Sequence, residues 1–195
     1  MFIVIEGPNG AGKTTTAARL GRRLRSAGRA VHVTAEPSDT PLGRLVRSAE
    51  AELTGRALAL AVAADRHVHV EQEILPALDE GRIVISDRYV PSSLVLQRLD
   101  GLDIDEVWEY NARLPAPTLT FYLHLAAQHL QTRLNDRQRL SRLEQAGSPE
   151  RELHLYRDAH RFLDRRGWRQ HWVDCGGKNP DQVTDRILEH LGSLP

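Results

Sequence analysis

The chain has 195 residues, and its 26 lysines and arginines balance its 26 aspartates and glutamates. This length suits one α/β domain with a proper core, so we expect a single domain over residues 1–195. Zero formal net charge argues against a general nucleic-acid or anionic-membrane binder, and no apolar run approaches the roughly 18 residues of a membrane span. The single cysteine, Cys175, excludes an internal disulfide and fits a reducing cytosol, so we expect a cytoplasmic protein.

Strand and helix signals alternate along the chain. Apolar runs predict five strands, at residues 2–5, 30–34, 82–86, 118–123 and 171–174. Helical patterns occupy residues 14–27, 41–53, 57–80, 92–98, 104–113, 126–145, 149–166 and 180–192, with a kink expected at Pro76. This alternation predicts an α/β fold, a three-layer α/β/α sandwich around a five-stranded, mostly parallel sheet.

The first strand leads directly into a phosphate-binding loop. Residues 7–14 read GPNGAGKT, which meets the pattern G-x-x-x-x-G-K-[ST] in full, and a helix follows. Glycines let backbone N–H groups turn inward around phosphate oxygens, and the helix N-terminus adds positive potential. Lys13 is expected to reach the β- and γ-phosphates, and the Thr14 hydroxyl to bind Mg²⁺. The sequence therefore predicts a nucleoside triphosphate site.

Two further segments begin where a predicted strand ends, at residues 36–40 and 87–89. In parallel sheets the carboxyl ends of the strands share one edge, so these segments and the loop should meet in one crevice. Asp87 is suited to holding Mg²⁺ through water, and the fork of Arg88 to gripping a second phosphate. The alternative reading of the Asp87-Arg88 pair is a turn with a surface salt bridge.

Arginines elsewhere allow two interpretations each. Arg66 lies in a helix lined by Ala and Val, where it either reaches solvent or points into a polar pocket. Residues 133–151 hold the densest group of arginines. They form either a solvated helix face or a lid that supplies positive charge to a transferring phosphate. Spacing alone leaves both interpretations of Arg66 open. For residues 133–151 it favours the solvated helix face.

Taken together, these segments make the sequence resemble the thymidylate kinases, which are P-loop nucleoside monophosphate kinases. Four segments in the right order carry the likeness, over nearly the whole chain. They are the loop at 6–15, Glu36-Pro37 with residues 40–43, the block at 63–66 through 83–97, and residues 141–144. Within the third, Ile85-Ser86-Asp87-Arg88-Tyr89 followed by Ser92, Ser93 and Gln97 is the most specific. The resemblance raises the lid interpretation above the solvated face.

The family implies that the ATP γ-phosphate passes to the 5′-phosphate of a deoxynucleoside monophosphate, most simply dTMP, in a homodimer whose lid spans about residues 133–151. The resemblance assigns catalysis to Lys13, Asp87, Arg88 and Arg142, and Mg²⁺ to Thr14 and Asp87. ATP binding falls to Gly7, Asn9, Gly10, Ala11, Gly12, Lys13, Thr14, Thr15 and Arg137. The resemblance assigns binding of the acceptor to Asn9, Glu36, Pro37, Val62, Arg66, Arg88, Ser92, Ser93 and Gln97.

Within these sets, Arg88 would hold the acceptor phosphate, Arg66 the base, and Arg142 the transferring phosphate, while Arg137 would cover the adenine. Gly10 stands where one version of the family has a loop arginine, so the chain resembles the version with lid arginines. Several acceptor-side residues depart from the family. Asn9 replaces an acidic residue that contacts the sugar, Ala35 an arginine, Val62 an aromatic ring that stacks on thymine, Leu96 a tyrosine and Ser141 an aspartate.

These departures keep two other functions open. One is a kinase for an unphosphorylated nucleoside or another small acceptor, for which Glu36 could act as the base. The other is a nucleotide-binding module without turnover, which the changes at Asn9, Ala35 and Val62 motivate. The intact Lys13 and Arg88 favour phosphoryl transfer.

Overall fold

The computed structural model describes residues 1–135, 142 and 147–192. Its centre is a five-stranded sheet in the order β2-β3-β1-β4-β5. The strands are β1 (Phe2–Glu6), β2 (Val31–Ala35), β3 (Ile83–Asp87), β4 (Leu119–His124) and β5 (Gln170–Asp174). Every neighbouring pair is parallel, and each strand lies within a residue or so of its predicted position. The predicted fold class is confirmed.

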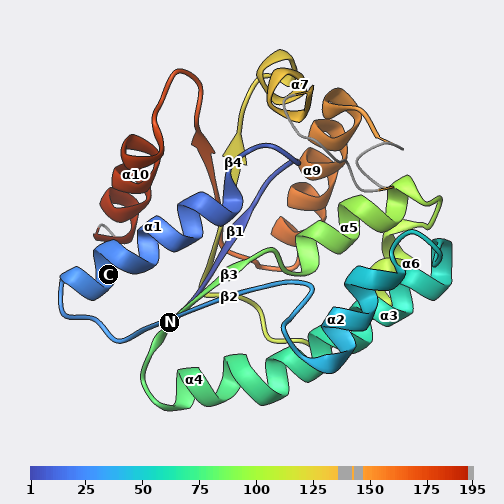
Figure 1. The fold of residues 1–195 in the computed structure, drawn as a ribbon, viewed down its shortest axis with the longest axis horizontal. Coiled ribbons are helices and arrows are strands. Elements are labelled where there is room, and N and C mark those ends of the chain that lie inside the picture. The colour runs from blue at the N-terminus through green and yellow to red at the C-terminus, as the bar shows by residue number, and fades with distance from the viewer. Residues whose placement is uncertain (136–141, 143–146, 193–195) are drawn as a thin grey trace.

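Helices cover both faces of the sheet. One face carries α1 (Lys13–Ser26) and α10 (Pro180–Gly192), while α2 to α6 and α9 gather on the other (Figure 1). Those elements are α2 (Pro41–Ala49), α3 (Gly55–His69), η1 (Val70–Ile74), α4 (Leu75–Asp79), α5 (Val90–Leu99), α6 (Ile104–Glu109) and α9 (Pro149–Asp164), and α7 (Ala127–Asn135) follows β4. Among the described residues, no helix is long and apolar enough to span a bilayer.

Pro76 does not end its helix. The segment η1 is a π-helical turn placed just ahead of it, where the Leu75 N–H donates to the carbonyl of Val70. Proline has no N–H to offer to the preceding turn, and a widened turn accommodates that loss without breaking the helix. The predicted helix at 57–80 is therefore three consecutive segments, α3, η1 and α4.

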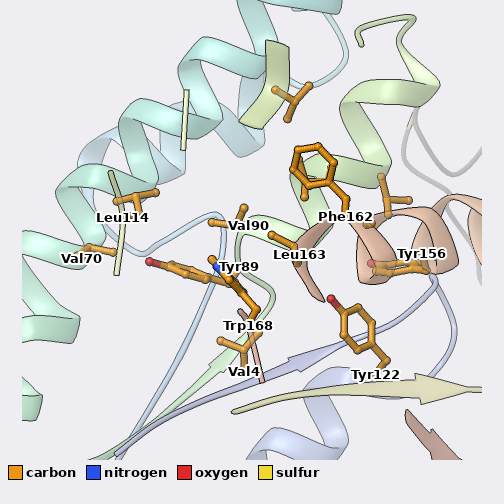
Figure 2. Packing of buried hydrophobic residues seen from close by; sticks show 14 of the residues in the cluster. Val4, Val70, Tyr89, Val90, Leu114, Tyr122, Tyr156, Phe162, Leu163 and Trp168 are labelled. Atoms are coloured by element: carbon orange, nitrogen blue, oxygen red, sulfur yellow. The ribbon is translucent and has the colours of Figure 1, made fainter. Parts of the chain in front are cut away.

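The central strand β1 faces two hydrophobic clusters. Phe2 and Val4 pack with α5 and α9, whereas Ile3 and Ile5 pack with α1 and α10, as the alternation of side chains along a strand requires. Figure 2 shows the first cluster, in which Tyr89 and Trp168 lie close to Val4, and Tyr122 of β4 lies beside Tyr156 of α9. This packing fixes β1 rigidly, and with it the loop that leaves its carboxyl end.

Register then brings the motifs to one edge. Ile5, the penultimate residue of β1, pairs with Asp87 at the end of β3. On the other side it pairs with Phe121 of β4. The phosphate loop and the Asp87-Arg88 pair therefore leave neighbouring strands side by side.

Candidate active site at the carboxyl edge of the sheet

Three glycines with positive φ angles shape the phosphate loop. Gly7, Gly10 and Gly12 have φ angles of 139°, 84° and 97°, which other residues rarely adopt. At Gly7 a Cβ would also lie 2.6 Å from the carbonyl oxygen of Leu123. Gly12 is the residue before α1, so the unpaired N–H groups of that helix open into the loop. Such a loop binds anions through backbone groups.

Lys13 folds back over the loop. Its Nζ donates to the carbonyl oxygens of Gly7 at 2.7 Å and of Pro8 at 3.0 Å. Burial, followed by the nearby charge of Arg88, lowers the pKa of Lys13 to about 7. The negative charge of a bound triphosphate would favour the protonated amine, so this side chain is matched to a polyanion.

Thr14 and Asp87 form a candidate Mg²⁺ site. The Thr14 hydroxyl donates to Asp87 Oδ2 at 2.5 Å, and the other carboxylate oxygen, Oδ1, is buried without a hydrogen-bond partner among the described residues. A buried carboxylate oxygen left unpaired is costly unless a cation or an unseen donor meets it. A hydroxyl and a carboxylate are the hard oxygen donors that Mg²⁺ prefers, so the residues present fit the ion.

Arg88 stands between two cavities, with a φ of 76°. Its guanidinium donates to Asn9 Oδ1 at 2.7 Å and to Ser92 Oγ at 3.2 Å. Beneath it lies Glu6, fully buried at the end of β1, which accepts from the backbone N–H groups of Tyr89 and Ser92. Burial raises the pKa of Glu6. Glu6 received no role from the sequence, although an acidic residue closing an apolar strand was the available signal.

The first cavity lies on the triphosphate side. It measures about 250 Å³ and is lined by Asn9, Gly10, Gly12, Lys13, Thr14, Thr15 and Arg88. Two other predicted ATP-binding residues, Gly7 and Ala11, shape the loop backbone, where Gly7 accepts from Lys13 and the Ala11 N–H donates to Pro8. The last, Arg137, lies outside the described residues.

The second cavity, of about 240 Å³, brings together every residue predicted to bind the acceptor. Its lining is Asn9, Glu36, Pro37, Val46, Glu50, Leu58, Val62, Arg66, Arg88, Ser92, Ser93, Leu96 and Gln97. Asn9 and Arg88 line both cavities, so they form the wall where the two meet. The cavity's polar side includes Gln97, whose Oε1 is buried without a partner in the described part of the chain and is available to a donor on a base.

Arg66 points into this polar pocket instead of reaching solvent. It is 2% exposed. Its Nε donates to Glu36 at 2.6 Å, Nη1 to Asn111 at 2.5 Å, and Nη2 to the Tyr89 carbonyl at 3.2 Å. A guanidinium carries five N–H groups, so donors remain for a ligand. Asn111 was not identified from the sequence, because nothing local marks it as a partner of a residue on α3.

Two arginines of the expected lid, Arg142 and Arg133, contact different parts of the molecule. Arg142 pairs with Asp100 through Nη1 at 2.5 Å and Nη2 at 2.7 Å, and it also donates to the carbonyls of Glu50 and Leu53. All three of its nitrogens are thus engaged beside the acceptor cavity. Arg133, which received no role of its own from the sequence, donates to the Gly10 carbonyl on the phosphate loop at 3.1 Å. Most of the expected lid at 133–151 lies outside the described residues.

Comparisons with known proteins agree with this geometry. Residues 5–168 match the thymidylate kinase family. A probable thymidylate kinase of Thermococcus kodakarensis is 39% identical over 148 residues, covering 70% of this chain and 72% of the relative. One of Pyrococcus horikoshii is 38% identical over 160 residues, 78% of each chain. A thymidylate kinase of Xanthomonas euvesicatoria pv. vesicatoria is 43% identical over 127 residues, 64% of this chain and 56% of the relative. This chain belongs to the thymidylate kinase family.

Proposed function

We propose that this enzyme transfers the γ-phosphate of ATP to the 5′-phosphate of dTMP, giving ADP and dTDP. The observation that carries the proposal is the pair of cavities that share Asn9 and Arg88. One is built from the phosphate loop and the other from side chains suited to a nucleoside. Two phosphorylated molecules held in them meet end to end at Arg88.

Catalysis here is positional and electrostatic. Lys13 binds the β- and γ-phosphates, and Arg88 binds the acceptor phosphate and turns its oxygen toward the γ-phosphorus. That oxygen forms the new P–O bond while the bond to the β–γ bridging oxygen breaks, and ADP leaves with the electron pair. The attacking oxygen already belongs to an ionised phosphate, so no general base is required.

Thr14 and Asp87 would hold Mg²⁺, which when bound neutralises charge on the triphosphate. On the acceptor side, Arg66 and Gln97 bind the base edge, and Val62 and Leu96 give the cavity an apolar wall. We further propose a cytoplasmic homodimer. Leu45 on α2 and Leu60 on α3, which are 59% and 47% exposed, support association through these helices.

Glu36 is a poor candidate for the base that a nucleoside kinase would need. Its Oε2 accepts from Arg66 at 2.6 Å, and its Oε1 lies 3.3 Å from His69 Nδ1. Both oxygens are already engaged. A free nucleoside would also leave Arg88 without a phosphate to bind, so the geometry supports a monophosphate acceptor.

The test is ADP release from ATP and Mg²⁺ in the presence of dTMP, dUMP, dCMP, dGMP or thymidine. We expect the strongest stimulation with dTMP and none with thymidine. Stimulation by thymidine alone would support the nucleoside kinase instead. ATP binding without stimulation by any acceptor would overturn the proposal in favour of a non-catalytic module.

A further inference from the structure

A buried carboxylate from a distant helix supports the phosphate loop. Glu152, in the first turn of α9, is 3% exposed. One of its oxygens accepts from the Asn9 backbone N–H at 2.9 Å and the other from the Asn9 side-chain Nδ2 at 3.0 Å. Glu152 therefore engages both the backbone and the side chain of a residue 143 positions away.

This contact fixes which way the Asn9 amide faces. An ionised carboxylate only accepts hydrogen bonds and a guanidinium only donates them. The amide must therefore turn its NH₂ toward Glu152 and its oxygen toward Arg88, where Oδ1 accepts at 2.7 Å. The chain Glu152–Asn9–Arg88 is satisfied in this one orientation alone.

The orientation of the Asn9 amide determines which oxygen atoms hold the Arg88 guanidinium. An acidic side chain at position 9, which the family resemblance leads us to expect, would face Glu152 as a second carboxylate and would repel it. With Asn9 the carboxylate comes from α9 instead of the loop. Among the described residues, Arg88 then donates to two neutral side-chain oxygens, Asn9 Oδ1 and Ser92 Oγ. The carboxylates of Asp87, Glu6 and Glu152 act on its charge without a direct hydrogen bond to it in this part of the chain.

We propose that Glu152 is a positioning residue for phosphoryl transfer. It orients the amide of Asn9, and the amide aims the Arg88 guanidinium at the acceptor phosphate. This inference rests on the proposed function, because it takes Arg88 as the residue that binds the acceptor phosphate.

Single substitutions should break the chain from either end. In Glu152→Gln, the amide oxygen is needed to accept from the Asn9 backbone N–H, which leaves its NH₂ facing the Asn9 side chain. Asn9 then turns its own NH₂ toward Arg88, and two donors meet. We expect kcat/KM for dTMP to fall about tenfold, with ATP affinity within about twofold of wild type. In Asn9→Asp, two carboxylates face each other, and we expect a similar or larger loss. Glu150→Gln, on the exposed side of the same helix turn, is the matched control and should be silent.

The decisive variant is the double substitution Asn9→Asp with Glu152→Gln, which moves the carboxylate from α9 back to the loop. The new amide on α9 can donate to the new carboxylate on the loop, and that carboxylate can still accept from Arg88, so donors and acceptors match again. We expect kcat/KM for dTMP to recover to within about threefold of wild type, as interacting sites allow. Independent roles for the two residues would make the two losses add. A merely structural role for Glu152 would lower the unfolding temperature of the single variants and leave kcat/KM of the folded protein unchanged.

The measurements are steady-state kinetics with dTMP, ATP affinity by calorimetry, and thermal unfolding of each variant. If a single variant does not fold, recovery of folding together with activity in the double variant still supports the pairing. A double variant that folds but shows summed losses, or a folded Glu152→Gln with unchanged kinetics, would overturn the inference. Absence of dTMP-dependent ADP release in the wild type would instead overturn the proposed function.

Discussion

The triphosphate cavity and the acceptor cavity are nearly equal in volume, about 250 and 240 Å³, yet they are built differently. Apart from Arg88, the first is lined by one contiguous segment, Asn9 to Thr15, and its chemistry rests largely on backbone groups. The second draws side chains from residues 9 to 97, on several helices and loops. Backbone chemistry depends little on side-chain identity, whereas the acceptor cavity can change its lining one residue at a time.

The departures from the family follow this division. The residues that we propose for the triphosphate, Lys13 and Thr14 with Asp87, fit the motifs on which the family resemblance rests. Val62 and Leu96, which replace ring-bearing residues, both line the acceptor cavity. Asn9 lies on the wall between the cavities, where its side-chain amide donates to Glu152. Because only a few side chains act on the triphosphate side, loss of one of them should have a severe effect, whereas substitutions in the lining of the acceptor cavity should have graded effects.

The largest effect is expected from Asp87→Asn. The unpaired Oδ1 is buried, so an amide removes charge from the candidate Mg²⁺ site without changing its shape. We expect kcat to fall about 10²- to 10³-fold, as for loss of a major electrostatic contributor, with KM for dTMP little changed. Kinetics over a Mg²⁺ titration measure this. Thr14→Ser keeps the hydroxyl and serves as the control, and a loss in Asp87→Asn below about threefold would contradict the assignment.

The next effect is the pH dependence of ATP binding. The pKa of Lys13, lowered to about 7 by burial and by Arg88, should rise when a triphosphate binds, so binding takes up a proton. Affinity for ATP is then highest below about pH 7 and falls by up to about tenfold per pH unit above it. Calorimetry in EDTA at a series of pH values on both sides of this pKa measures the fall. Lys13→Arg, which stays charged, should show no such fall, and the same slope in both proteins would contradict this account.

A smaller effect is expected from Val62→Phe. A phenyl ring in this wall of the acceptor cavity can stack on thymine, a contact worth about 1–3 kcal/mol in nucleic-acid binders. We expect KM for dTMP to fall about fivefold or more, while ATP affinity stays constant. Leu75→Phe, an exposed position on α4 outside the cavity lining, is the control. An increase in KM would mean that the cavity has no room for a ring.

Much of the fold could be predicted because its signals are local. Each strand is a short apolar run ended by turn residues, and the phosphate loop is a contiguous pattern. The end of α2 was predicted too late, at residue 53 instead of Ala49. There the carbonyls of Glu50 and Leu53 accept from Arg142, so a distant side chain satisfies backbone groups beyond the helix end, which a local pattern does not reveal.

The site was predicted as a set of residues but not as a set of contacts. Arg66 was ambiguous because Asn111, 45 positions away, satisfies part of its guanidinium. Glu152 was missed because its partner Asn9 is 143 positions away and no spacing rule connects them. Long-range pairs of this kind follow from the topology of the sheet and the packing of α9, neither of which a local pattern encodes.

The smallest effect concerns the pairing of Arg142 with Asp100. This bidentate pair is only partly shielded, with side-chain exposures of 26% and 7%, and such pairs contribute modestly. Since Arg142 also binds the Glu50 carbonyl beside the acceptor cavity, Asp100→Asn should raise KM for dTMP about threefold and leave ATP affinity unchanged. Glu52→Gln, an exposed position in the loop that holds Glu50 and Leu53, is the control.

Arg142→Ala then distinguishes the two sides of the molecule. If Arg142 acts beside the acceptor cavity, as its contacts indicate, this substitution should reproduce the Asp100→Asn increase in KM with little change in kcat. A loss of kcat on the order of a hundredfold in Arg142→Ala, with Asp100→Asn silent, would place Arg142 at the transferring phosphate, as the family resemblance implies. The ratio of the two effects therefore decides whether the charge of Arg142 serves the acceptor cavity or the phosphate in transfer.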